Sequence, residues 1–434
     1  MQPAQNLEKQ YGIGRMAREH VKKRVVGAAP MASRRAATRA APTSVNLDSS
    51  RARPALPSTA DCLATSTSVQ SDSSSNPQAK RQNALRAAMQ ERRVPFFLVT
   101  HLTNIAYLTG FRATAGVAIF DSRDAILWVD PRYTLQAQEE ARGVEVIEER
   151  EGLYKAVAAW LKAHKVRRLG FEEAHLTCAG FSRLRKEAGQ HIRFLPLTGL
   201  VEQLRAVKEE EEVAKIRQAG RITAEVFAKV LEIVKPGVRE CDLAAEIEYL
   251  MRKKGAQGAA FETIVASGAR AARPHARASR KVLKENELVI FDLGAILGHY
   301  AADMSRTVYL GQPSRRVRSL FNAVAEAQER AAKSALPGVR AGDVDGVARR
   351  SLAERGLARF FTHSTGHGVG METHELPRLA RGEKARLQSG NVVTAEPGVY
   401  LEGWGGIRIE DTLLVGPGGP EVLTPAPKDH WIVE

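Results

Sequence analysis

Two pairs of carboxylates lie inside β-prone, apolar segments in the last third of this 434-residue chain. The first pair is Asp292 and Asp303, in ELVIFDLGAILGHYAADMSRTVYL, which is typical of a β-hairpin. An even-numbered loop centred between Leu297 and Gly298 would place the aspartates opposite each other, with Cβ atoms ~4.5–5.5 Å apart. Buried carboxylates at that distance repel each other, and a bound cation would remove the cost. A protonated carboxylate, or a shifted register with one group in solvent, would also remove it.

The second pair repeats this arrangement on either side of a glycine-rich loop. Glu396 follows an apolar run in NVVTAEPGVYL, and Glu410 follows another in GIRIEDTLLV. Asp411 comes directly after Glu410 and should point to the other face of the strand, which indicates a structural role. Four carboxylates balance the charge of two divalent cations, which lie ~3.5–4 Å apart in two-metal sites.

Three of the 11 histidines of the chain, His363, His367 and His374, lie in HSTGHGVGMETHE, between the carboxylate pairs. Glycine lets the backbone approach a ligand closely, and imidazole is a common metal ligand. The glycines do not form a dinucleotide-binding motif, because no strand leads into them and no helix follows. An oxygen-rich site with one imidazole favours Mn²⁺ over structural zinc. Three solvent-facing loop histidines are the alternative.

Two regions of alternating elements must position these residues. In the region 81–200, a helix is predicted over 82–93, and further helices over 152–165 and 177–188. They alternate with the strand-like runs FFLV, AGVAIF, AILWVD and VEVI, which predicts a small α/β domain.

The region 201–434 begins with a long helix that runs from Lys208 and ends at Lys235-Pro236-Gly237. A second helix is expected over 240–254, followed by strands, helices near 315–335 and 343–356, and the carboxylate-bearing hairpins. This pattern predicts a larger α+β domain.

Residues 1–80 differ in composition from the rest of the chain. They hold 12 basic and 5 acidic residues and are rich in Ala, Ser, Thr, Arg and Pro, which predicts a disordered basic, Ser-rich extension. A targeting segment, or a start assigned too early with Met31 or Met89 as the true start, is the alternative.

Composition excludes several classes of protein. No stretch approaches the ~20 apolar residues of a membrane span, so we expect no membrane insertion. Aromatic residues make up 6% of the chain and are scattered, so no nucleic-acid surface is expected in the core. The three cysteines, Cys62, Cys178 and Cys241, are too few and too far apart for a disulfide scaffold. They fit a reducing compartment, and we expect a cytoplasmic protein.

The sequence resembles the pita-bread metallopeptidases, specifically the Xaa-Pro aminopeptidases and prolidases. The resemblance covers about 81–434 and rests on ASGARAARPH, FDLGAILGHYAADMSRT, HSTGHGVGMETHE, TAEPGVY and IRIED, in family order. HLTNIAYLTGF and VDPRY are similar to the family's creatinase-like first domain. The resemblance implies an α+β fold, with a C-terminal pita-bread domain preceded by a smaller creatinase-like α/β domain, and a homodimer or higher homo-oligomer.

The resemblance also assigns site residues. The five positions of the family's metal ligands are Asp292, Asp303, His367, Glu396 and Glu410. The family's histidines outside this set fall on His275, His363 and His374. The resemblance adds Arg408 and Tyr400 as partners of a ligand such as Asp292; a strand salt bridge for Arg408 and a core position for Tyr400 are the alternatives. Ser305 departs from the commoner Thr before Arg306 but keeps the hydroxyl.

The expected function is a metal-dependent exopeptidase that hydrolyses the Xaa-Pro bond at peptide N-termini, an Xaa-Pro aminopeptidase. A hydroxide bridging two divalent ions, with Mn²⁺ favoured over Co²⁺ or Zn²⁺, would attack the carbonyl before proline. Glu396 would carry the proton to the leaving nitrogen, and His374 would stabilise the oxyanion. His275 and His363 would hold the substrate, a peptide with proline second. The alternatives are an Xaa-Pro dipeptidase (prolidase) and a non-catalytic peptide-binding module.

Overall fold

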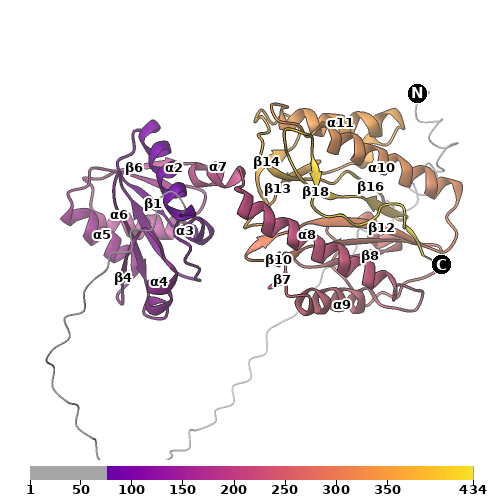
Figure 1. The fold of residues 1–434 in the computed structure, drawn as a ribbon, viewed down its shortest axis with the longest axis horizontal. Helices are drawn as coiled ribbons and strands as arrows, with labels where there is room; N and C mark the ends of the chain where they lie inside the picture. The colour runs from indigo at the N-terminus through magenta and orange to yellow at the C-terminus, as the bar shows by residue number, and fades with distance from the viewer. Residues whose placement is uncertain (1–75, 434) are drawn as a thin grey trace, which may run out of the picture.

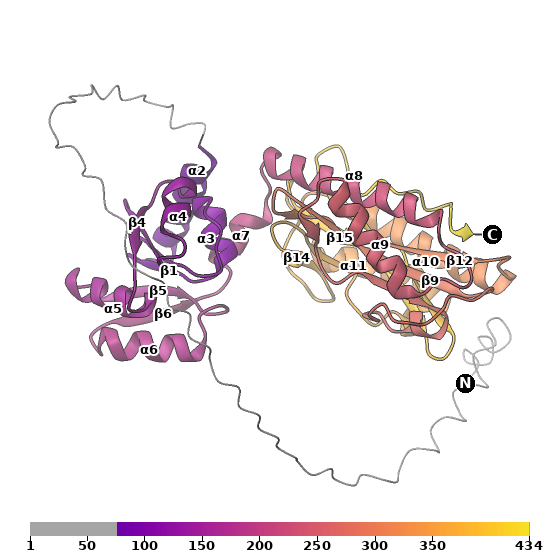
Figure 2. The same ribbon diagram turned by 90° about the horizontal axis from the view of Figure 1, so that it is seen from below.

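The computed structural model describes residues 76–433. It has two lobes, which we define as residues 76–206 and 207–433; helix α7 (Leu200–Ala206) lies at the junction between them (Figures 1 and 2). The extension expected over 1–80 therefore lies outside the described residues, apart from 76–80, and so does Cys62. The domain boundary predicted between residues 200 and 201 falls at the start of α7, whereas the lobes defined above divide at its end. We propose the earlier position as the domain boundary.

The first lobe is built on one mixed six-stranded sheet in the order β4-β3-β2-β1-β5-β6. Its strands are β1 (Phe97–Val99), β2 (Val117–Phe120), β3 (Ala125–Val129), β4 (Glu145–Glu148), β5 (Arg168–Glu172) and β6 (Arg193–Leu197). Strands β1, β2 and β3 pair antiparallel, whereas β4 joins β3, β5 joins β1 and β6 joins β5 in parallel. Parallel neighbours need a crossover, and helices supply it.

The helices of the first lobe are α2 (Pro77–Glu91), α3 (Leu102–Thr109), α4 (Thr134–Glu140), α5 (Leu153–Ala163), α6 (Cys178–Ala188) and α7. Three of them, α2, α5 and α6, correspond to predicted segments; α2 begins five residues before its predicted start, and α3, α4 and α7 were not predicted. The N-cap Asn76 accepts hydrogen bonds from the first backbone amides of α2, and Thr177 does the same for α6. Two apolar clusters, one on each side of the sheet, form the core of this lobe.

The second lobe packs two pairs of helices against several short sheets, whose strands pair antiparallel except for β20 (Ile432–Val433), which joins β12 (Met304–Leu310) in parallel (Figure 1). The helices are α8 (Glu210–Leu231), α9 (Glu240–Lys253), α10 (Arg315–Ser334) and α11 (Ala341–Glu354). Helix α8 ends at Leu231, four residues before the predicted stop. The amides of Ile233 and Val234 donate hydrogen bonds to the carbonyls three residues earlier. Bonds of this 3₁₀ type replace the α-helical pattern at the end of the helix.

The strands of the second lobe form sheets in the orders β20-β12-β9-β8, β14-β13-β15-β18-β19, β11-β10-β7 and β16-β17. They are β7 (Gly258–Ala259), β8 (Ile264–Ser267), β9 (Leu288–Leu293), β10 (Ala295–Leu297), β11 (Tyr300–Ala301), β12 (Met304–Leu310), β13 (Gly366–Gly368), β14 (Glu375–Leu379), β15 (Val392–Ala395), β16 (Gly398–Leu401), β17 (Gly405–Arg408), β18 (Asp411–Leu414), β19 (Glu421–Val422) and β20 (Ile432–Val433). The short 3₁₀ helices are Gly268–Ala272 and Ala358–Phe360.

The register of the first carboxylate hairpin differs from the prediction. Asp292 on β9 pairs with Ser305 on β12, not with Asp303. The turn is therefore centred one position later, between Gly298 and His299, as the pairing of Leu297 with Tyr300 also shows. A shift of two pairing positions keeps each side chain on its own face, because side chains alternate with a period of two. The two carboxylates therefore still face the same side.

The second pair of carboxylates lies where two predicted strands are each broken in two. Residues 391–401 form β15 and β16, which part at Glu396, and residues 406–415 fall on β17 and β18, which part at Glu410. Ala395 pairs with Asp411, and Gly398 pairs with Arg408, in one continuous register. Glu396 and Glu410 therefore fall opposite each other at the break.

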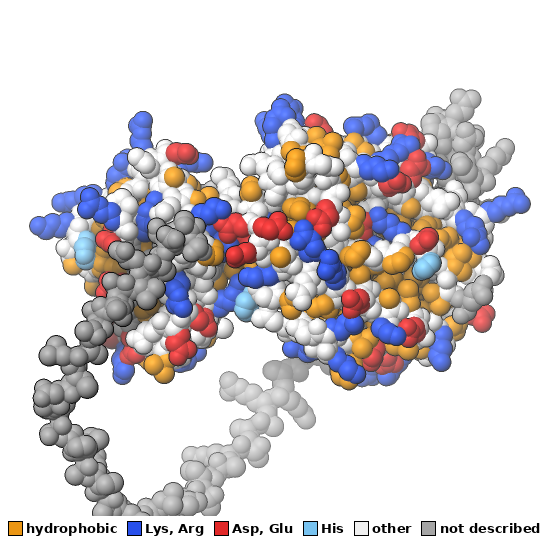
Figure 3. Space-filling view, in the orientation of Figure 1, with side chains coloured by type: hydrophobic (Ala, Val, Ile, Leu, Met, Phe, Trp, Pro, Cys, Tyr) orange, Lys and Arg blue, Asp and Glu red, His pale blue; other side chains and the backbone are white. Residues whose placement is uncertain are grey.

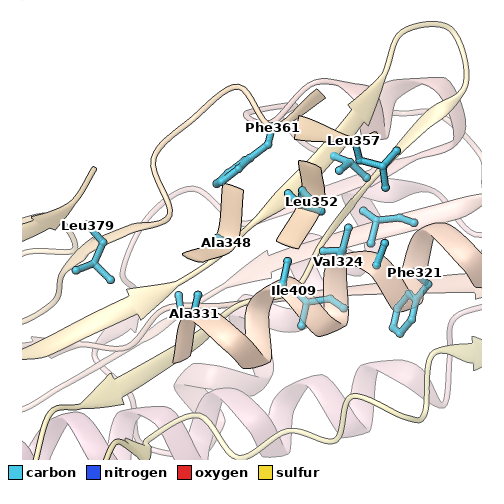
Figure 4. Packing of buried hydrophobic residues seen from close by; sticks show 14 of the residues in the cluster. Phe321, Val324, Ala331, Ala348, Leu352, Leu357, Phe361, Leu379 and Ile409 are labelled. Atoms are coloured by element: carbon cyan, nitrogen blue, oxygen red, sulfur yellow. The ribbon is translucent and has the colours of Figure 1, made fainter. Parts of the chain in front are cut away.

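A large apolar cluster holds these broken strands against α10 and α11 (Figure 4). Ile409, which directly precedes Glu410, is buried in this cluster with Phe321, Val324 and Leu352. On the other side, α8 and α9 pack on β9 and β12 through a second cluster that includes Phe227. The strands that carry the carboxylates are thus fixed from both sides. The predicted α+β class is confirmed.

Candidate active site

The structure brings the five predicted ligand residues together in the lining of one cavity of about 870 Å³. One ligand atom from each of Asp303, His367 and Glu410 lies within 4.8 Å of the other two, and all three residues are buried. Glu396 joins them, with Oε1 3.5 Å from Nε2 of His367. Asp292 lines the same cavity.

His367 is oriented by the short strand β13. Its Nδ1 lies 3.0 Å from the carbonyl oxygen of Gly368, which can only accept, so Nδ1 carries the hydrogen. Burial, followed by the charge of His374, lowers the pKa of His367 to about 4, so the ring is neutral. The bare lone pair of Nε2 therefore faces two carboxylates, Asp303 at 3.7 Å and Glu396 at 3.5 Å. With the carboxylates ionised, this arrangement is favourable when a cation lies between them.

Glycine is required beside His367. A Cβ atom on Gly366 would lie 2.0 Å from the carbonyl oxygen of Thr394 on the adjacent strand β15. The close approach of β13 to β15 brings His367 toward Glu396, which comes directly after β15. This gives the glycines of HSTGHGVG a structural reason.

The carboxylates perturb one another strongly. Burial, and then the charges of Glu410 and Asp292, raise the pKa of Asp303 well above its usual range. Burial and the charge of Glu410 do the same for the pKa of Glu396. Burial and Asp292 raise the pKa of Glu410 to about 8. Raised values of this kind arise from burial next to like charge.

Arg408 supplies a fixed positive charge among these carboxylates. Its Nη2 donates to Oδ2 of Asp292 at 2.6 Å, and its Nε donates to Oγ of Ser305 at 2.8 Å. Ser305 in turn donates to Oε2 of Glu410 at 2.7 Å. One guanidinium therefore orients two predicted ligands, one directly and one through a hydroxyl. Asp292 keeps its other oxygen, Oδ1, buried and without a hydrogen-bond partner.

Tyr400 and His363 extend this network away from the carboxylates. Nη1 of Arg408 donates to the hydroxyl of Tyr400 at 2.9 Å, and that hydroxyl lies 2.8 Å from Nε2 of His363. Nδ1 of His363 lies 2.8 Å from the carbonyl oxygen of Ser364, so Nδ1 donates and Nε2 accepts from Tyr400. Both ring nitrogens of His363 are therefore occupied. The residue can offer a substrate its ring, but not a hydrogen bond.

His374 and His275 are the exposed histidines of the cavity. The ring of His374 lies 4.1 Å from that of His367, and burial together with His275 lowers the pKa of His374. A neutral His374 can donate a hydrogen bond into the cavity. All ten predicted site residues are thus placed in or directly behind this cavity.

The donor set fits divalent metal ions. A bound cation would stabilise the four carboxylates, one of which, Asp292, has an oxygen without a hydrogen-bond partner. It would also accept the lone pair of the neutral His367, which points between Asp303 and Glu396. Oxygen-rich ligation of this kind suits hard or borderline ions. Asp292, Asp303, His367, Glu396 and Glu410 are the residues that would hold them.

Sequence reasoning missed the residues that the first lobe and α7 bring to the cavity. His175, Glu202 and Arg205 line it, although they lie at least 60 residues from any predicted site residue. Nη2 of Arg205 donates to Glu375 and Glu372 at 2.5 and 2.6 Å, and these two glutamates lie on either side of His374 in the sequence. No local motif marks these residues, because only the packing of the two lobes brings them together.

The sequence matches two known protein-family models. Metallopeptidase family M24 matches residues 214–417, and the creatinase/prolidase N-terminal domain matches residues 81–207. Among individual proteins, the chain is similar to an Xaa-Pro dipeptidase of Pyrococcus horikoshii. The two are 35% identical over 338 residues, which cover 77% of this chain and 94% of that protein.

Solved structures give the same family. An Xaa-Pro dipeptidase from Bacillus anthracis superimposes with a TM-score of 0.79 and is 36% identical, covering 82% of this chain and 99% of that one. An X-Pro aminopeptidase from Thermotoga maritima superimposes with a TM-score of 0.73, also at 36% identity, covering 80% of this chain and 100% of that one.

Proposed function

The chain belongs to metallopeptidase family M24, and we propose that it is an Xaa-Pro dipeptidase, a metal-dependent hydrolase of dipeptides that end in proline. The sequence placed the aminopeptidase first and the dipeptidase second. The cavity and the relatives named as dipeptidases favour the reverse order. A metallopeptidase hydrolase is common to both.

The observation that carries the dipeptidase is Arg378. This residue lies on β14, is exposed, and lines the cavity. Its charge contributes to the lowered pKa values of His367 and His374, so it lies near the carboxylate cluster. Among the described residues, its guanidinium forms no hydrogen bond or ion pair. In a dipeptide the carboxylate of proline lies one residue beyond the cleaved bond, and an unpaired guanidinium is the group that binds it best.

The chemistry depends on the arrangement of the side chains. Bound divalent ions would supply Lewis-acid activation of water and of the carbonyl group. Glu396 would take a proton from the attacking water and return it to the leaving nitrogen of proline. That nitrogen is a tertiary amide without a hydrogen, so it must be protonated to leave. The neutral His374 would donate to the developing oxyanion, and His275 and the ring of His363 would contact the substrate.

An Xaa-Pro aminopeptidase is the second candidate. Its support is the likeness to the Thermotoga maritima aminopeptidase, which is as similar in sequence as the Bacillus anthracis dipeptidase. The two activities differ in the group attached to the carbonyl carbon of proline, which is a free carboxylate only in a dipeptide. In a tripeptide the free carboxylate belongs to the third residue. Arg378 would then face the peptide bond that follows proline instead of a carboxylate.

Three substrates test the choice: Ala-Pro, Ala-Pro-Ala and the amide Ala-Pro-NH₂, each with the Mn²⁺-loaded protein. A dipeptidase cleaves Ala-Pro and loses most of its kcat/KM on the amide, which has the same bond but no carboxylate. Faster cleavage of Ala-Pro-Ala than of Ala-Pro would establish the aminopeptidase. Cleavage of none of them would contradict both.

Arg378→Gln tests the assigned residue. We expect KM for Ala-Pro to rise about 10- to 100-fold, because a charge-assisted hydrogen bond is lost, with a smaller change in kcat. Arg381→Gln, three residues away outside the cavity lining, is the matched control. An unchanged KM in Arg378→Gln would contradict the role of Arg378 and favour the aminopeptidase.

We also propose the metal, the oligomeric state and the location of the protein. Mn²⁺ is proposed as the metal because the ligand set is rich in oxygen. A homodimer or higher homo-oligomer, and a cytoplasmic location, are proposed from the sequence. No helix among residues 76–433 has the length and apolar character needed to cross a membrane.

A further inference from the structure

A second cluster of metal-type side chains lies on the first-lobe wall of the cavity. His101 is the N-cap residue of α3, His175 follows β5, and Glu202 lies on α7. One ligand atom from each lies within 4.8 Å of the other two, the same criterion that Asp303, His367 and Glu410 satisfy. The imidazoles of His101 and His175 stack with centroids 3.7 Å apart.

One nitrogen of His101 has no partner. Its Nε2 lies 3.2 Å from Oε1 of Glu372, which can only accept when ionised, so Nε2 carries a hydrogen. Burial opposes ionisation of Glu372, but the hydrogen bond from His101 and the charge of Arg205 outweigh it and lower its pKa to about 2. Nδ1 of His101 is buried without a hydrogen-bond partner, 4.0 Å from Oε1 of Glu202.

This unpartnered nitrogen points to a cation. In the neutral ring the lone pair of Nδ1 faces a carboxylate, which is unfavourable without positive charge between them. A proton on Nδ1 is one remedy, but it leaves the donor beyond hydrogen-bond distance of Glu202. A metal ion would bind the lone pair of Nδ1 of His101 directly. It would also bind Nε2 of His175, which lies 3.1 Å from the same oxygen of Glu202.

The surrounding side chains hold two of the three candidate ligands as metal ligands are usually held. Nε2 of His101 is bound by Glu372, and Glu202 accepts a hydrogen bond of 2.6 Å from Asn104. Asn104 is itself fixed by Arg205 at 2.7 Å. Ligating histidines commonly donate their other N–H to a carboxylate in this way, and ligating carboxylates are hydrogen-bonded in turn.

We propose that His101, His175 and Glu202 form a third metal site, which binds a divalent transition-metal ion of the zinc class. Two imidazoles and one carboxylate with a fourth open position are an established ligand set for zinc. Ligand atoms at ~2.0–2.1 Å from a tetrahedral ion lie roughly 3.4 Å apart, close to the present spacing of these atoms. The two rings are parallel, so they must tilt out of their stack before both lone pairs point at one ion. His175 and Glu202 line the cavity, so the fourth position opens toward it.

The site would connect the two lobes. Its ligands belong to the first lobe and α7, whereas Glu372, the outer partner of His101, lies two residues before His374. Acidic and basic side chains gather over the waist between the lobes (Figure 3). An ion at His101, His175 and Glu202 would therefore fix the position of the loop of His374 relative to the first lobe. This inference stands whether the enzyme is a dipeptidase or an aminopeptidase.

The test counts zinc in the full-length protein after removal of metal with a chelator and reloading with Zn²⁺. His175→Asn removes one ligand, and we expect it to bind one ion fewer per chain than the unsubstituted protein. His191→Asn, an exposed histidine outside the cavity lining, is the matched control and should bind the full number. Zinc retained at the carboxylate cluster of His175→Asn shows that the variant is folded.

Anomalous diffraction at the zinc edge locates the ion. We expect a peak between His101 and His175 in the unsubstituted protein and in His191→Asn, and no peak there in His175→Asn. Equal zinc contents in all three proteins, with no peak between the histidines, would overturn the proposal and indicate that a proton on His101 is the only cation at this site.

Discussion

Arg408 donates a 2.6 Å hydrogen bond from Nη2 to Oδ2 of Asp292, and this pair lies at the edge of the carboxylate cluster. The guanidinium is buried, and its pKa is raised well above the usual range: burial opposes the charge, but Tyr400 and Asp292 outweigh it. It therefore stays charged at any working pH. Arg408 neutralises part of the cluster permanently and fixes Asp292 so that Oδ1 stays free for a metal ion.

Arg408→Lys should weaken metal binding. Lysine keeps the charge but cannot reach Asp292, Ser305 and Tyr400 at once, because it lacks the planar fork. We expect the affinity for Mn²⁺ to fall about 10- to 100-fold, as is usual when an outer partner of a ligand is lost. Isothermal titration of the metal-free protein measures it. An unchanged affinity would mean that Arg408 has only a structural role.

Glu396→Gln should stop turnover while the protein stays folded. Glutamine has the same shape but cannot accept and return a proton, so kcat should fall by about 10²–10⁴-fold or more. Circular dichroism should be unchanged, and bound metal should be measured in parallel so that lost metal is not mistaken for lost proton transfer. Full activity in this variant would exclude Glu396 as the proton carrier.

The metal-free protein should lose stability as the pH rises. Burial and Asp292 raise the pKa of Glu410 from 4.5 to about 8. A carboxyl group with a raised pKa in the folded state binds its proton more tightly there than in the unfolded chain. Its contribution is therefore full below about pH 4.5 and is lost as the pH rises to about 8. Asp303 and Glu396 act in the same direction.

Thermal unfolding between pH 5 and pH 9 checks this expectation. In the presence of a chelator, Tm should fall across this range, and the fall should be smaller in Glu410→Gln. Saturating Mn²⁺ should reverse the trend, because metal binding displaces these protons and strengthens as the pH rises. A Tm that rises with pH in the chelated protein would contradict the raised pKa values.

A buried ion pair lies in the second lobe, directly after the junction between the lobes. Nζ of Lys208 lies 3.0 Å from Oε2 of Glu375, and the two side chains are 1% and 4% exposed. Lys208→Met leaves Glu375 with Arg205 as its remaining cation. We expect a loss of about 3 kcal/mol in the free energy of unfolding, near the lower end for breaking a buried pair.

A urea titration compares this variant with a surface pair. Lys155→Met removes the partner of Glu151 on the exposed face of α5, and it should leave the unfolding midpoint unchanged. Equal midpoints for Lys208→Met and Lys155→Met would show that the buried pair does not stabilise the folded protein.

The sequence by itself determined the class of chemistry and the elements that carry it. Periodic apolar positions predicted α8 because a helix that packs on a sheet must bury one face. The types and order of Asp292, Asp303, His367, Glu396 and Glu410 indicated a metallopeptidase, and that family is confirmed. These signals are local or depend on motif order, so no coordinates were needed.

Only the tertiary structure decided how these residues meet. The pairing of Asp292 with Ser305 depends on a turn at Gly298 and His299 and on the strands at both sides of β9, none of which a hairpin pattern fixes. The breaks at Glu396 and Glu410 arise where strands pass from one sheet to another, which a continuous β-prone run conceals.

The cluster of His101, His175 and Glu202 could not be predicted from the sequence, because it too depends on tertiary packing. Its members come from three segments of the first lobe and α7, and their outer partner Glu372 comes from the second lobe. Residues so far apart in the chain meet only because the burial of apolar surface packs the segments that carry them into one structure. Sequence patterns record which residues can do chemistry, whereas packing decides which of them face one another.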